Sequence, residues 1–227
     1  GEWELDRLEV PLKKKIGEGT FGKVYESIWR GTPVAVKTIN EGMVPIKDAL
    51  SKEFIVLTKL HHPNILQLLG ACTLNEPYLI VTELMMENIM NYNIRNTSFQ
   101  KLLDMSIDIA RGLAYLHNRR PNCVIHRDLK PTNLLLTTSG KVKIADFGIS
   151  CFQKKSTEKF DMTGETGSYR YMAPEVMAYK EYDASVDIYS FGMIIYKLFV
   201  DFPFIDKTNY EIIALVKKKH RPVIPKL

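Results

Sequence analysis

The sequence contains the octet His126-Arg127-Asp128-Leu129-Lys130-Pro131-Thr132-Asn133, followed further along the chain by Asp146-Phe147-Gly148. Asp128 carries a carboxylate that can orient a hydroxyl group and accept its proton. Lys130 carries an ammonium that can neutralise a phosphate. Asn133 and the aspartate of the second motif supply the oxygen ligands that Mg²⁺ prefers. This set of groups suits phosphoryl transfer.

The octet resembles the catalytic loop of eukaryotic-type protein kinases, and the resemblance runs from about Leu12 to the end of the chain. It implies an α+β, bilobal fold. The small β-rich N-lobe with one helix would span residues 12–83, the hinge 83–88, and the larger, mainly α-helical C-lobe 89–227. The chain stops where related kinases continue with further helices, so we expect the C-lobe to be truncated.

The same resemblance implies ATP and Mg²⁺ as cofactors and protein substrates as partners. It assigns catalytic roles to Asp128, Lys130, Asn133, Lys37 and Glu53. Asn133 and Asp146 would be the metal ligands.

Residues 16–24 contain glycines at positions 17, 19 and 22, which would let backbone amides approach a triphosphate closely. A lone Gly-x-Gly-x-x-Gly also fits a plain hairpin turn, and a dinucleotide fold would need a helix straight after it. Residues from Leu12 to about Ile39 are expected to form strands, the clearest of them at 24–29 and 34–37, so the glycines lie between two strands, which favours the kinase flap. Lys37 on the second strand strengthens this interpretation.

Residues 46–60 show apolar side chains at helical spacing, and Glu53 lies within that stripe. A helical glutamate is most often a solvated charge or the partner of a residue one turn away. The resemblance instead implies an ion pair between Glu53 and Lys37 that would aim the ammonium at the phosphates.

The expected nucleotide site combines the flap, the strand behind it and the hinge. The resemblance implies binding by Ile16, Gly17, Gly19, Gly22, Val24, Ala35, Lys37, Thr82, Glu83, Met85 and Leu135. Thr82 would guard the back of the adenine pocket, and the hinge would use its backbone groups. Residues 87–97 depart from the family because no glycine follows the hinge, so no ribose contact is assigned.

The remaining elements follow from periodicity and breakers. We expect strands at 65–69, 78–83, 134–136 and 141–144, and helices at 99–118, 185–200 and 210–219. Asp187 falls in a buried helix, where a carboxylate needs a partner. In the family it accepts amides of the catalytic loop.

The loop from Asp146 to Glu175 is polar and rich in hydroxyl groups, which is usually ordinary loop chemistry. In this family such a loop is commonly ordered by phosphorylation, so an upstream activating kinase is a possible partner. The predicted site is Thr163 or Thr166, with Arg127 as the partner of the phosphate. Ser168 matches the position that contacts the catalytic aspartate and lysine.

Lys130 after Leu129 resembles the serine/threonine-specific pattern, and residues 167–175 resemble the tyrosine-kinase-like group, including Raf-like and mixed-lineage kinases. The expected activity is therefore ATP- and Mg²⁺-dependent phosphorylation of Ser and Thr hydroxyls in intracellular signalling, with dual specificity as an alternative. A pseudokinase or scaffold is the other alternative. Its usual sign is loss of the strand lysine, the catalytic aspartate or the metal aspartate, and Lys37, Asp128 and Asp146 are all present.

The composition excludes several other classes. The 227 residues are 45% hydrophobic with a net charge of +5, and no basic arm argues for nucleic acid. No apolar run is long enough for a membrane span. Cys72, Cys123 and Cys151 are odd in number and far apart, which fits a reducing compartment, so a cytoplasmic location is expected.

Overall fold

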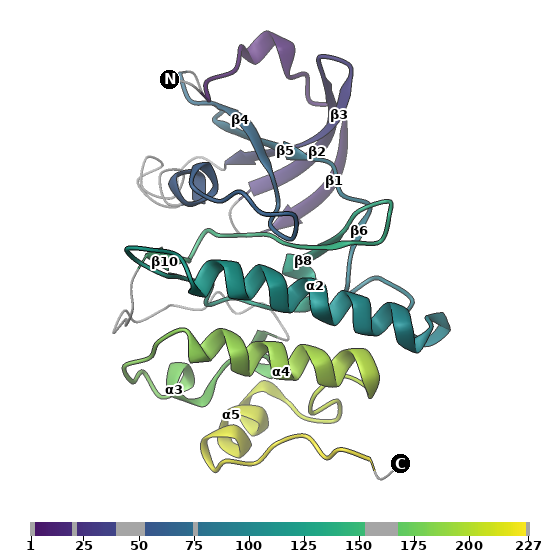
Figure 1. Ribbon diagram of the computed structural model, residues 1–227, viewed down its shortest axis with the longest axis vertical. Helices are drawn as coiled ribbons and strands as arrows, with labels where there is room; N and C mark the ends of the chain where they lie inside the picture. The colour runs from purple at the N-terminus through teal and green to yellow at the C-terminus, as the bar shows by residue number, and fades with distance from the viewer. Residues whose placement is uncertain (1–2, 20–21, 40–52, 75–76, 153–167, 226–227) are drawn as a thin grey trace.

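The computed structural model describes residues 3–19, 22–39, 53–74, 77–152 and 168–225. A β-sheet lobe lies above a mainly helical lobe, and the two ends of the chain lie at opposite ends of the molecule (Figure 1). The expected α+β, two-lobed architecture is therefore confirmed.

A five-stranded antiparallel sheet forms the N-lobe, in the order β1-β2-β3-β5-β4. Its strands are β1 (Lys14–Gly19), β2 (Gly22–Trp29), β3 (Thr32–Ile39), β4 (Leu68–Cys72) and β5 (Leu79–Glu83). Alternation places Val34 and Val36 in the core, with neither side chain exposed. Arg30 and Gly31, at φ 48° and 81°, make the two-residue turn between β2 and β3.

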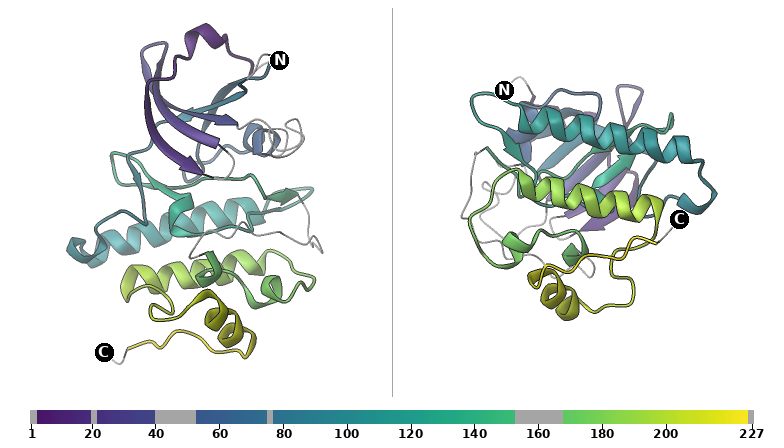
Figure 2. Two further views of the ribbon diagram at one scale, coloured as in Figure 1. Left: turned by 180° about the vertical axis from the view of Figure 1, so that it is seen from behind. Right: turned by 60° about the horizontal axis from the view of Figure 1, so that its bottom comes forward.

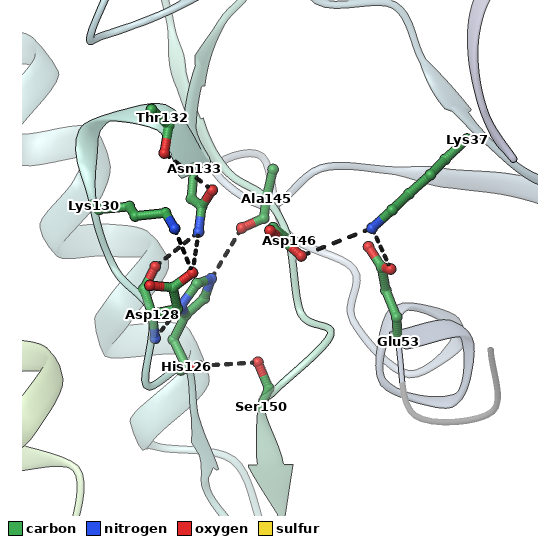
Figure 3. Close-up of polar contacts among 10 residues, drawn as sticks. All are labelled: Lys37, Glu53, His126, Asp128, Lys130, Thr132, Asn133, Ala145, Asp146 and Ser150. Atoms are coloured by element: carbon green, nitrogen blue, oxygen red, sulfur yellow. Dashed lines mark hydrogen bonds and ion pairs between the residues drawn. The ribbon is translucent and has the colours of Figure 1, made fainter. Parts of the chain in front are cut away.

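The described part of the predicted N-lobe helix is helical over residues 53–58, and residues 46–52 lie outside the described part of the chain. Leu57 and Leu60 are buried in the main core and Phe54 packs against it, as the apolar spacing predicted, and Val56 is buried there as well. The Glu53 side chain of this helix points toward Lys37 of β3 (Figure 3).

The predicted strand at 65–69 is misplaced, because the strand begins only at Leu68. The segment before it bonds to β9 (Val142–Ile144) instead: Ile144 N donates to Asn64 O and Leu66 N donates to Ile144 O, both at 2.9 Å. Ile65 is buried in the main core and forms an isolated bridge with Ile144, so the apolar pattern of this segment resembled that of a sheet strand.

The C-lobe is built on two long helices that lie side by side, α2 (Phe99–His117) and α4 (Ser185–Phe199) (Figure 2). Below them lie α3 (Pro174–Met177) and α5 (Asn209–Lys217), which begins with a capping box between Thr208 and Glu211. The two long helices match their predicted ranges within one residue, whereas α5 ends at Lys217, before the end predicted for it at residue 219.

Short elements complete the lobe and connect it to the sheet. The remaining strands are β6 (Glu87–Asn88), β7 (Val124–Ile125), β8 (Leu134–Leu136) and β10 (Cys151–Phe152). The 3-10 turns are η1 (Arg7–Glu9), η2 (Ile94–Asn96), η3 (Pro131–Asn133) and η4 (Ser168–Arg170). β8 and β9 pair as predicted, and β6 adds a third strand to them.

The segment before Leu12 also packs on the N-lobe. Leu5 N donates to Ala71 O at 2.8 Å, and Ala71 N donates to Trp3 O at 2.9 Å. Val10 is completely buried. The N-lobe therefore includes residues on the amino-terminal side of the boundary expected from the motifs.

Across the described ranges, none of the helices combines the length and apolar character needed to cross a membrane.

Candidate active site

A cleft of about 730 Å³ lies between the sheet and the catalytic loop. Its lining includes most of the side chains expected to bind nucleotide: Ile16, Gly22, Val24, Ala35, Lys37, Thr82, Glu83, Met85 and Leu135. Gly17 and Gly19 lie in β1, and Gly17 is not among the described residues that line the cleft. The sheet, hinge and C-lobe thus meet at one site.

Lys37 connects the sheet to the helix and to the motif that follows β9. Its Nζ lies 2.7 Å from Glu53 Oε2 and 3.8 Å from Asp146 Oδ1 (Figure 3). Burial acts to lower the pKa of Lys37, but the carboxylates of Glu53 and Asp146 outweigh it and raise the pKa. The ammonium is therefore charged at neutral pH and directed into the cleft.

Asp128, Lys130 and Asn133 come together on the opposite wall. Lys130 Nζ lies 2.9 Å from Asp128 Oδ2, and Asn133 Nδ2 donates to Asp128 O at 2.8 Å and to Asp128 Oδ2 at 3.1 Å. Burial raises the pKa of Asp128, and the charge of Lys130 opposes that rise. The contacts hold the carboxylate in one orientation while leaving it on the cleft lining.

The catalytic loop is held from below by Asp187, which is fully buried in α4. Its carboxylate accepts the amides of His126 and Arg127, both at 2.8 Å, and lies 2.8 Å from His117 Nε2. These bonds satisfy the buried charge and confirm the amide contacts expected from the sequence.

His126 ties the catalytic loop to the second motif. Its Nε2 donates to Ala145 O at 3.0 Å, and its ring contacts Phe147 edge-on with centroids 5.1 Å apart. Arg127 and Asp146 adopt φ values of 73° and 64°, which are uncommon for residues other than glycine. Such conformations persist where surrounding contacts impose them, and they gather at functional sites.

Ser168 lies beside this group. Lys130 Nζ donates to its Oγ at 3.4 Å, while its expected contact with Asp128 stays a prediction. Arg127 donates to Ile149 O and, at 3.2 Å, to the Tyr182 hydroxyl. Thr163 and Thr166 lie outside the described residues.

The sequence placed Met86, Glu87 and Asn88 in the expected hinge but assigned them no role in nucleotide binding. Met86, Glu87 and Asn88 line the cleft there because β6 pairs with β8, with Asn88 opposite Leu135. A two-residue strand has no periodicity from which to predict it. The hinge is also braced, because Glu83 Oε1 lies 2.6 Å from Lys143 Nζ and accepts Gln67 N at 2.8 Å.

The oxygens of Asn133 and Asp146 fit a hard divalent cation. The amide nitrogen of Asn133 is committed to Asp128, which leaves its carbonyl oxygen as the group available for a metal. Among the described residues, no cluster of three or more His, Cys, Asp or Glu side chains could hold a metal alone. Two protein oxygens suit Mg²⁺, which keeps waters and phosphate oxygens in its shell.

The sheet lobe, the helical lobe and the charged walls of the cleft define a two-lobed phosphotransferase. The chain belongs to the protein tyrosine and serine/threonine kinase family, whose sequence model matches residues 10–227. The resemblance to protein kinases of the tyrosine-kinase-like group is confirmed.

Several curated proteins are similar to this chain over nearly all of its length. Serine/threonine-protein kinase VIK of Arabidopsis thaliana is 41% identical, covering 97% of this chain and 53% of that protein. Tyrosine-protein kinase SRK3 of Spongilla lacustris is 35% identical, covering 99% of this chain and 68% of that protein. Serine/threonine/tyrosine-protein kinase HT1 of Arabidopsis thaliana is 34% identical, covering 99% and 59%. The chain thus spans about half to two thirds of these relatives, and it is a kinase domain homologous to serine/threonine kinases.

Proposed function

We propose that this domain transfers the γ-phosphoryl group of ATP, with Mg²⁺, to serine and threonine hydroxyls of protein substrates. The observation that carries the proposal is the arrangement of Lys130 and Asn133 around the Asp128 carboxylate on the cleft wall. A carboxylate held in this way can receive the proton of a hydroxyl that attacks a phosphoryl group.

The residues of the cleft form two groups, one for the base of the nucleotide and one for its phosphates and the metal. The hinge at Glu83 and Met85 and the apolar Val24, Ala35 and Leu135 would hold the base of the nucleotide. Lys37, oriented by Glu53, would bind its phosphates, and Asn133 and Asp146 would hold the metal. When bound, Mg²⁺ supplies positive charge that neutralises the phosphate oxygens.

The side chains of this domain take part directly in only two ways, by accepting a proton and by neutralising charge. Asp128 orients the acceptor hydroxyl and takes its proton, a contribution of roughly 10²–10⁴-fold. Lys130 offsets negative charge beside the acceptor oxygen, and the rest of the acceleration comes from alignment of the two substrates.

Dual specificity is the second candidate. It is favoured by the relatives that are named as tyrosine or serine/threonine/tyrosine kinases. A pseudokinase would lack part of the charged machinery, whereas Lys37, Glu53, Asp128, Asn133 and Asp146 all lie on the cleft.

The test is transfer of label from γ-labelled ATP to dephosphorylated casein, followed by phosphoamino-acid analysis. Label on serine or threonine that disappears in Asp128→Asn supports the proposal, while equal turnover in that variant refutes the role of Asp128. Label on tyrosine as well establishes dual specificity. Nucleotide binding without any transfer supports a pseudokinase instead.

The metal assignment has its own measurement. Asp146→Asn should shift the Mg²⁺ titration of activity to higher concentration, because the amide replaces an anionic ligand. An unchanged titration curve would remove Asp146 from the ligand set.

Regulation by an upstream kinase acting on Thr163 or Thr166 is also proposed, with Arg127 as the residue that would pair with the phosphate. Phosphosite mapping of the active protein, followed by Thr→Ala variants at each position, tests it. A cytoplasmic location is proposed as well, and it is supported by Cys72 and Cys123, which are buried as thiols and not joined in disulfides.

A further inference from the structure

Arg170 makes contacts that the proposed chemistry does not use. It ends η4, and its guanidinium donates to the backbone of the loop after α4. Nη1 donates to Pro203 O at 2.7 Å and also to Phe204 O, and Nη2 donates to Lys207 O at 3.2 Å. A rigid, planar group with several donors suits this task, and the single ammonium of lysine cannot reproduce it.

The loop held by Arg170 leads directly into α5. Phe204 adopts a φ of 54°, uncommon for a side chain of this size, and Lys207 N closes a turn onto Phe204 O at 3.0 Å. Thr208 then caps α5. The guanidinium therefore stabilises a strained turn that sets where α5 begins.

Residues 168–171, which include Arg170, lie beside the catalytic loop, and we call this segment the acceptor wall. Ser168, in the same turn, receives a hydrogen bond from the catalytic Lys130 at 3.4 Å. Tyr171 O, one residue after Arg170, accepts Ser190 Oγ of α4 at 2.7 Å. Ser190 thus anchors this wall to α4, and Arg170 anchors it to the loop before α5.

Apolar side chains also join the acceptor wall to the start of α5. Met172 and Ile212 of α5 belong to one buried cluster, and Tyr169 and Phe204 pack against it. The acceptor wall and the start of α5 therefore share one core, to which Arg170 adds three directed bonds.

We propose that Arg170 is a positioning residue for the protein acceptor, an inference that rests on the proposed kinase activity. By fixing the 168–171 wall against the 203–207 loop, it sets the affinity for the acceptor and leaves nucleotide binding alone. Neither Arg170 nor that loop is part of the described lining of the nucleotide cleft.

The test compares Arg170→Lys and Arg170→Met with the wild type. Loss of charge-assisted hydrogen bonds should raise KM for dephosphorylated casein about tenfold and leave KM for ATP unchanged. Arg170→Lys keeps the charge and much of the side chain, so it guards against simple misfolding. A purely structural role would lower the amount of active enzyme, and hence kcat, with both KM values unchanged, and that result overturns the proposal.

Arg221→Lys is the matched control. Its Nη1 donates to one carbonyl of a neighbouring residue, His220 O at 2.8 Å, and its guanidinium lies over the Tyr189 ring. We expect both KM values to stay at the wild-type level. An equal rise in casein KM in this control would show that any lost arginine has the same effect, which contradicts a specific role for Arg170.

Hydrogen exchange provides a readout that needs no catalysis. Arg170→Met should accelerate exchange in both 168–172 and 203–208, whereas acceleration of 203–208 alone overturns the coupling. If the wild type transfers no label to casein, the proposed function fails, and the exchange result still decides whether Arg170 joins the wall to the loop.

Discussion

Glu53 Oε2 lies 2.7 Å from Lys37 Nζ, and this ion pair joins the third strand of the sheet to the N-lobe helix. Both side chains are largely shielded, with 21% of Lys37 and 11% of Glu53 exposed. Removing one partner from such a pair leaves a desolvated charge, which costs more than loss of a surface ion pair.

Glu53→Gln should therefore lower kcat/KM for ATP by roughly 10–100-fold, because Lys37 loses the charged acceptor that orients it. Steady-state kinetics with varied ATP measures this. Glu9→Gln is the control, since Glu9 pairs with Arg30 at an exposed site far along the sheet. Comparable losses in the two variants would show that the Glu53 pair has no special role.

Acid should inactivate the enzyme through Asp128. Burial raises the pKa of Asp128, and only the ionised carboxylate can accept a proton. kcat should therefore fall as the pH drops through that raised pKa, at a pH above the ordinary aspartate value of about 3.9. Lys130→Met removes the charge that opposes the rise, so the acid limb of the pH–kcat profile should move further upward. A limb that stays fixed in this variant would assign it to another group.

Asp187→Asn should loosen the catalytic loop. The amide can accept only through one oxygen, so at least one of the buried amides of His126 and Arg127 loses its acceptor. We expect a loss of about 1–3 kcal/mol in the free energy of unfolding, measured by urea denaturation, together with reduced kcat. Asp104→Asn, on the exposed side of α2, should change neither. Full stability in Asp187→Asn would mean that another donor or acceptor compensates.

Two helical glycines should respond in opposite ways to alanine. A Cβ on Gly112 would lie 2.8 Å from Ile144 Cδ1 and 3.0 Å from Asn64 O, because α2 approaches β9 closely there. Gly112→Ala should destabilise the fold by about 1–3 kcal/mol. Gly192 in α4 has nothing within 4 Å, so Gly192→Ala should stabilise by about 0.5–1 kcal/mol. Thermal unfolding of both variants measures the difference, and equal effects would contradict the close packing of α2.

Much of the fold followed from local patterns. Alternation predicted β2, a short β-branched run predicted β3, and apolar spacing with clear breakers predicted α2 and α4. The strand expected at 65–69 was wrong in its position because Ile65 is buried through its contact with Ile144, and the sheet strand begins only at Leu68. A run of apolar residues indicates that the segment is buried, but it does not indicate which strand its backbone pairs with.

Part of the candidate active site could likewise be predicted from the sequence, and part could not. Asp128, Lys130 and Asn133 lie within one short loop, so their chemistry and mutual proximity could be inferred from adjacent letters. Their roles, and the pairing of Lys37 with Glu53, came from resemblance to a family, and the structure brings those two side chains together. The cleft wall at Asn88 had no sequence signal, because it exists only where β6 meets β8.

The residue types along the chain thus account for the kind of chemistry, the long helices and most of the sheet, since those depend on short-range periodicity and contiguous motifs. Two other sets of contacts depend on packing between segments far apart in sequence. These are the hydrogen bonds of Arg170 to the carbonyls of Pro203, Phe204 and Lys207, and those of the catalytic-loop amides to Asp187. Such contacts form only when the packing of α4 and α5 in the C-lobe brings the partners together, and no local pattern of residues predicts that proximity.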